Sequence, residues 1–172
     1  MPQSRVLRVD HATSYPFDVL AANPSLGRLT HLLCHPHAQR PGAPSAYITL
    51  EHLRALCHSP HLTNLRHLRL LLTEFGDEGA EEFVTSGILK RLNVLERTHG
   101  CIRDAGAPHL AACPDLNNLS LLDLTMNALT PDGIAALEAT GVTLKTGEQH
   151  DEHPDRIGDR GWLGYLSYGD LE

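Results

Sequence analysis

A 27-residue period runs through the middle of the chain and constrains its fold more than any other feature. Three segments, at residues 59–86, 86–113 and 113–140, align without gaps. The columns that recur include Leu62, Leu89 and Leu116; Leu65, Leu92 and Leu119; Leu68, Leu95 and Leu122; and Gly79, Gly106 and Gly133. Because chance clustering of leucines would not also keep the glycines in step, each segment is a copy of one structural unit.

Each unit contains the pattern of a short strand followed by a helix. The alternating Leu122 and Leu124 predict a strand with one buried face, and Asn127 is placed to bond backbone groups where the chain turns. The helices that follow are expected to be capped by aspartates, namely Asp77, Asp104 or Asp132. A unit of this length cannot bury its leucines alone, so the copies must stack. The sequence therefore predicts an α/β fold, a right-handed solenoid with a parallel β-sheet on the concave side and helices on the convex side.

The period also divides the chain. Repeats are expected over residues 26–147, as units 26–61, 62–88, 89–115 and 116–142 and a partial unit. The first unit is stretched by a loop insertion at 35–46, which is rich in proline and glycine. Residues 1–25 form an N-terminal cap with an extra strand at 5–10, and residues 148–172 form an acidic linker with an aromatic C-terminal tail.

The repeats resemble the ribonuclease-inhibitor type of leucine-rich repeat. SPHLTNLRHLRL (59–70), GDEGAEEFVTS (76–86) and DLTMNALTPDGIAAL (123–137) are similar to bacterial proteins of this type, which are abundant in planctomycetes. For eukaryotic members the resemblance implies protein binding on the concave face. For bacterial members it implies a fold with no assigned activity.

Side chains between the inward leucines are expected on the concave face, where a protein partner would bind. The expected contact residues are His67, Arg69, Leu71, Glu96, Thr98, Asp123 and Thr125. The alternative is an ordinary solvated sheet face. A second contact surface is predicted in the tail, which folds back as a cap or anchors a partner through Trp162, Leu163, Tyr165, Leu166 and Tyr168.

Arg97 departs from the template, because it stands where the units before and after it have Leu70 and Leu124, and Gly100 stands in the asparagine column. One interpretation is that Arg97 is solvated at a frayed strand end or bonded to backbone carbonyls. The other is that it binds the carboxylate of a partner, which adds Arg97 to the contact residues.

Composition excludes several classes of function. Of the formal charge of −7, the segment 148–172 carries −5, from seven acidic residues against two arginines. No basic stripe remains for a nucleic-acid partner. The chain shows no apolar run suited to a signal peptide or a membrane helix, and its four cysteines form no CxxC pair. We expect a cytoplasmic protein with reduced thiols and no membrane insertion.

Catalytic and metal-binding patterns are sparse. Cys34, His35 and His37 are the candidate metal ligands, although their spacing matches no zinc motif and Cys34 also suits the core. No nucleophile elbow, phosphate loop or HExxH motif occurs, and any solenoid offers triples such as His99, Cys101 and Asp123 by chance. The expected function is protein–protein interaction without a cofactor or catalytic residues. The alternatives are a structural or accessory subunit of a larger assembly, held by its edges and tail, and then a metal-dependent or hydrolytic enzyme.

Overall fold

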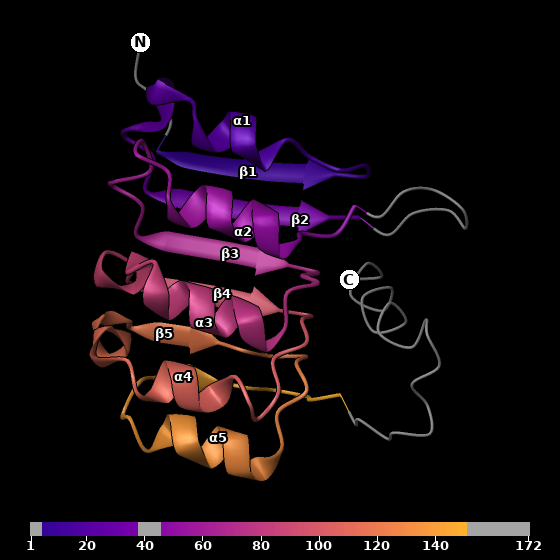
Figure 1. Ribbon diagram of the computed structural model, residues 1–172, viewed down its shortest axis with the longest axis vertical. Coiled ribbons are helices and arrows are strands. Elements are labelled where there is room, and N and C mark those ends of the chain that lie inside the picture. The colour runs from indigo at the N-terminus through magenta and orange to yellow at the C-terminus, as the bar shows by residue number, and fades with distance from the viewer. Residues whose placement is uncertain (1–4, 38–45, 151–172) are drawn as a thin grey trace.

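The computed structural model describes residues 5–37 and 46–150, which form one β-sheet covered by helices (Figure 1). All strand pairs are parallel, and the spatial order of the strands follows the chain. The strands are β1 (Val6–His11), β2 (His31–Pro36), β3 (His67–Leu71), β4 (Val94–Thr98), β5 (Leu121–Asp123) and β6 (Leu144–Lys145). The helices are α1 (Phe17–Ala21), α2 (Leu50–Cys57), α3 (Asp77–Thr85), α4 (Ala107–Ala111) and α5 (Pro131–Glu138).

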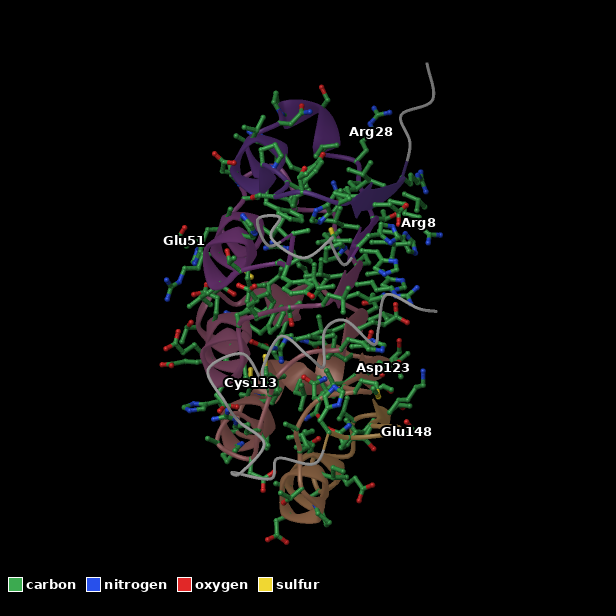
Figure 2. The ribbon with its side chains drawn as sticks, turned by 90° about the vertical axis from the view of Figure 1, so that its right-hand side faces the viewer. Arg8, Arg28, Glu51, Cys113, Asp123 and Glu148 are labelled. Atoms are coloured by element: carbon green, nitrogen blue, oxygen red, sulfur yellow. The ribbon has the colours of Figure 1, made fainter. Side chains whose placement is uncertain are left out.

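One helix lies between each pair of successive strands, and all five helices cover the same face of the sheet (Figures 1 and 2). The core lies between the two layers. Connections of this length are what parallel neighbours require, because a tight turn can join only antiparallel strands. The predicted α/β class with a parallel sheet is confirmed. Among the residues that the structure describes, none of the helices has the length and apolar character of a membrane-spanning segment.

The register of the sheet follows the sequence period. Leu68 lies opposite Leu95, and Leu95 lies opposite Leu122, so each 27-residue step moves the chain by one strand. The leucines of these columns are buried, and Leu62, Leu89 and Leu116 have no exposed surface. The leucines that repeat in the sequence therefore form successive layers of one apolar core.

The N-terminal residues form β1 and α1, in the segment where the sequence predicts a cap with an extra strand. Val9, Phe17 and Leu20 are buried in the same core as the later leucines. The segment therefore has the strand–helix composition of the units that follow it. Of the predicted insertion at 35–46, His35 and Pro36 belong to β2, and residues 38–45 lie outside the described residues.

Each of the three central strands is followed by a residue in the left-handed backbone conformation. Leu72, His99 and Met126 have φ values of 54°, 53° and 56° and stand 27 residues apart. Such a conformation costs about 1 kcal/mol or more for a residue with a side chain, so neighbouring contacts must hold it. In the last copy, the buried side chain of Asn127 donates to the carbonyl of Leu124 at 3.0 Å, as its position in the repeat predicts.

The repeated aspartates connect units instead of capping their own helices. Asp77 accepts a hydrogen bond from the backbone N–H of Arg103 at 2.8 Å, and Asp104 accepts one from that of Thr130 at 2.9 Å. The N-cap residue of α3 is Gly76, and α5 is capped by Thr130, whose hydroxyl accepts from the N–H of Asp132. The predicted capping role is therefore wrong for these three aspartates. The turn before each helix lies against the next unit, and that brings Asp77 and Asp104 within reach of its backbone.

Candidate partner-binding groove

The face of the sheet opposite the helices carries a groove of about 400 Å³ that extends across all six strands. In Figure 2, Arg8 and Asp123 lie on this strand side, whereas Glu51 and Cys113 lie on the helix side. Strand alternation sends every second side chain into the groove. Its lining includes Arg8, Leu33, His35, Arg69, Leu71, Glu96, Thr98, His99, Asp123, Thr125 and Lys145.

Glu96 is the central acidic group of the groove and is held by two basic side chains of β3. Its carboxylate lies 2.9 Å from Nε2 of His67 and 3.7 Å from Nε of Arg69. All three come from adjacent strands, with Arg69 directly opposite Glu96 in the register. The pairing fixes the direction of a carboxylate that is only 22% exposed.

Asp123 forms a second fixed acidic group near the C-terminal end of the sheet. One carboxylate oxygen accepts from the backbone N–H of Thr125 at 2.9 Å, and the other accepts from Nζ of Lys145 at 2.8 Å. Desolvation acts to raise the pKa of Asp123, but hydrogen bonds from Lys145 and Thr125 outweigh it and hold the pKa below its ordinary value. Asp123 therefore stays charged in the groove although its side chain is only 3% exposed.

Seven of the sequence-predicted contact residues lie at this face or at its border, six on strands and Thr125 in the turn after β5. Arg69, Leu71, Glu96, Thr98, Asp123 and Thr125 line the groove, and His67 contacts it through Glu96. Leu71 and Thr98 are nearly covered, with 6% and 9% exposure. The aromatic residues from Trp162 to Tyr168 lie outside the described residues.

Sequence reasoning missed two cations at the ends of the groove. Arg8 is contributed by β1 and Lys145 by β6, the two outermost strands. The alternation in residues 5–10 and the start of another unit at 141–145 carry a signal for both positions. Neither strand is in the gapless 27-residue alignment, so their register could not be assigned from it.

Arg97 is a core residue, and its predicted contact with a partner is wrong. Its side chain has no exposed surface, its guanidinium lies 4.7 Å from the centre of the Phe75 ring, and Nη2 donates to the Phe75 carbonyl. Nη1 donates to Oδ1 of Asn127 at 3.5 Å. Burial lowers the pKa of Arg97 to about 10. The prediction that Arg97 is solvated at a frayed strand end is also wrong. Its hydrogen bond to a backbone carbonyl agrees with the other form of that interpretation.

Gly100 explains how the core accommodates this guanidinium. A Cβ atom at this position would lie 2.7 Å from Oδ1 of Asn127 and 3.3 Å from Nη2 of Arg97. The Thr73 hydroxyl would lie 3.0 Å from the same Cβ, so the absence of a side chain at position 100 leaves room that Asn127, Thr73 and the guanidinium share. The two departures from the repeat therefore meet at one place in the core.

The three candidate metal ligands do not converge. Cys34 faces the core with 1% exposure, and burial raises the pKa of its thiol to about 12, which disfavours the thiolate that metals require. His35 and His37 lie on the opposite, groove side, where Asp10 of β1 joins them. The prediction of Cys34 as a ligand is therefore wrong, because successive residues of a strand point to opposite faces.

The triple of His99, Cys101 and Asp123 is divided among other contacts. The Cys101 thiol donates to the Thr73 carbonyl at 3.4 Å, and burial raises its pKa. His99 lies 3.4 Å from the Thr98 hydroxyl, and the Asp123 carboxylate is taken by Lys145 and Thr125. This arrangement does not provide an activated nucleophile.

Fold and groove together define the class of protein: an α/β protein with one sequentially ordered parallel sheet, helices on one face and a polar groove on the other. No family model matches the chain, and no curated protein matches it. Among solved structures it is similar to a crystal structure of a protein from Bacteroides fragilis, with a TM-score of 0.61 and 19% identity. The alignment covers 74% of this chain and 36% of that one, so the chain spans about a third of that protein's length. At this identity the likeness bears on the fold alone.

Proposed function

We propose that the chain is a short leucine-rich-repeat solenoid of the ribonuclease-inhibitor type and that it binds a protein partner in the groove. The coincidence of the 27-residue period with the strand register supports the solenoid. So does the recurrence of left-handed residues at 72, 99 and 126. In such a repeat the strand face offers an array of side chains whose spacing is fixed by the sheet.

The observation that carries the binding function is that the charged groups of the groove are held in place before any partner arrives. Glu96 is oriented by His67 and Arg69, and Asp123 by Lys145 and a backbone N–H. Ordering side chains on binding costs free energy, about 0.5–1.5 kcal/mol for each long one, and pre-oriented groups avoid much of that cost. Because the groove presents charges of both signs, with Arg8, Arg69 and Lys145 beside Glu96 and Asp123, the partner segment should also present both signs.

The test is affinity isolation from native cells with quantitative mass spectrometry, comparing the native chain with Glu96→Lys. The substitution places a cation beside His67 and Arg69, so a groove-bound partner should be depleted at least about tenfold. Glu51→Lys is the matched control, since Glu51 is exposed on the helix side (Figure 2). Equal recovery of every partner with Glu96→Lys and Glu51→Lys would refute binding in the groove, provided that circular dichroism shows both variants folded.

A structural or accessory subunit is the second candidate, and the position of β1 favours it. This six-residue strand lies at the end of the sheet order, and Val6 at its start is 49% exposed. An edge strand offers backbone groups on which another chain can add a strand. A partner held there, or by the tail, should survive Glu96→Lys and be lost from a chain that lacks residues 148–172 or carries Val6→Pro.

A further inference from the structure

Three side chains with metal-binding chemistry gather at the carboxyl ends of β1 and β2. Asp10 lies directly opposite His35 in the parallel register, and alternation places His37 on the same side as His35. Nδ1 of His35 lies 4.0 Å from Oδ1 of Asp10, and the rings of His35 and His37 have their centres 4.5 Å apart. One donor atom from each of the three residues lies within 4.8 Å of the other two.

We propose that Asp10, His35 and His37 bind a divalent transition-metal ion, with zinc as the expected ion and water in its fourth position. Zinc bonds of about 2.0–2.1 Å in a tetrahedral site place donor atoms about 3.3 Å apart. The donors must therefore approach one another by at most about 1.5 Å from their 4.8 Å limit, a movement within the range of side-chain rotation. The strands themselves need not move.

The ligand types determine which ion fits. Two imidazoles and one carboxylate suit zinc and related transition metals, whereas magnesium and calcium require a shell of oxygen ligands. The buried thiol of Cys34, which points to the opposite face, takes no part in this set.

The backbone around the site is fixed by hydrogen bonds. Asp10 and His35 belong to paired strands, and the N–H of His37 donates to the carbonyl of His11 at 2.7 Å. Ligands carried by a paired sheet lose little further freedom when the metal binds, which favours affinity.

Arg8 competes with the metal for the carboxylate of Asp10. Its Nε lies 3.1 Å from Oδ2 of Asp10 and donates to Oδ1 at 3.3 Å, but its side chain is 67% exposed. Exposed ion pairs of this kind are weak, so Arg8 can turn into solvent when a cation arrives. Removal of the Arg8 side chain should therefore strengthen metal binding. Metal that binds nonspecifically to surface histidines would not respond to this change.

The experiment is calorimetric titration of the full metal-free chain with Zn²⁺, repeated with Mg²⁺. We expect one equivalent of Zn²⁺ and no response to Mg²⁺. Loss of a ligand in His35→Ala, His37→Ala or Asp10→Asn should weaken zinc binding at least about tenfold, while Arg8→Gln should tighten it several-fold. His109→Ala is the matched control because this histidine is exposed on α4, on the helix side.

Co²⁺ absorption provides a second readout, since a tetrahedral site with imidazole ligands gives strong visible bands. The proposal is overturned if His35→Ala/His37→Ala binds Zn²⁺ as tightly as His109→Ala, or if Arg8→Gln weakens binding. Far-ultraviolet circular dichroism of each metal-free variant distinguishes a lost site from a lost fold. Arg8→Gln changes only an exposed side chain, so this variant should remain folded. Its zinc affinity therefore still tests the proposal if His35→Ala does not fold.

Discussion

Arg97 and Gly100 should behave as one energetic unit, and a double-mutant cycle can measure their coupling. The two single variants, Arg97→Leu and Gly100→Asn, each restore one residue of the repeat template, and the double variant restores both. If the glycine exists to admit the guanidinium, the free-energy changes of unfolding will not add.

The structure sets the expected size of each change. Burial lowers the pKa of Arg97 to about 10. At about 1.4 kcal/mol per pH unit, removing the charge relieves about 3 kcal/mol. Against this, Arg97→Leu leaves the Phe75 carbonyl without its arginine donor, at about 1–3 kcal/mol, and removes a buried cation–π contact worth about 2 kcal/mol. It also leaves a cavity beside Gly100, so the net loss is about 1–3 kcal/mol.

Gly100→Asn alone should also destabilise, by about 1–3 kcal/mol, because its Cβ would lie 3.3 Å from Nη2 of Arg97 and 2.7 Å from Oδ1 of Asn127, which the arginine itself holds by a hydrogen bond. In the double variant the asparagine fills the volume that the guanidinium leaves. We expect the double variant to be more stable than the sum of the single changes by about 1–2 kcal/mol.

Urea unfolding, monitored by far-ultraviolet circular dichroism, measures the free energy of unfolding of the native chain, the two single variants and the double variant. An equal dependence of this free energy on urea concentration in all four would show that their unfolded states are comparable. Arg69→Leu is the control for loss of an arginine from a neighbouring strand, and its partly exposed side chain should matter by less than about 1 kcal/mol. Additivity within about 0.5 kcal/mol would refute the idea that the two positions compensate each other.

Three further changes test other parts of the structure by the same urea assay. Asn127→Ala removes a buried amide that bonds three carbonyls and one backbone N–H, so it should cost about 2–4 kcal/mol; a loss below about 1 kcal/mol would contradict this role. Asp104→Ala removes the acceptor for the Thr130 N–H and should cost about 1 kcal/mol, whereas Glu138→Ala, at an exposed position of α5, should cost almost nothing. Because the pKa of Asp123 is lowered in the folded state, its contribution is complete above about pH 4 and is lost as the pH falls through the folded-state pKa. Asp123→Asn should therefore weaken the decline of stability as the pH falls below about 4, and an unchanged decline would refute this assignment.

The central part of the fold was predictable because its contacts repeat. Leu68, Leu95 and Leu122 occupy one column of the sequence and lie opposite one another in the sheet. The same spacing put Glu96 and Asp123 at equivalent positions of neighbouring strands, where the structure has them paired in register. Equal spacing in sequence translates into equal position in space whenever each unit packs only on its neighbours.

The pairing of β1 with β2 and of β2 with β3 was not predictable in this way, because the spacing of these strands in the sequence is irregular. Asp10 and His35 are 25 residues apart in register, whereas His31 and His67 are 36 apart. No common period can therefore bring Asp10 beside His35, and only the observed strand pairing does so. For this reason the sequence pattern predicted Cys34, which is next to His35 along the chain, as a metal ligand. It gave no indication of Asp10, which is next to His35 across the sheet.

Arg97 shows a different limit of sequence reasoning. Each departure from the template, taken alone, resembles a defect: a charge at a core position and a missing asparagine three residues later. In the structure, the glycine leaves the volume and the arginine fills it, donating to Phe75 and Asn127 from the neighbouring units. Since a close-packed core couples every side chain to the space beside it, two departures in one unit have to be evaluated together. A repeat unit that lost only its leucine, or only its asparagine, would be less stable than one that lost both in this combination.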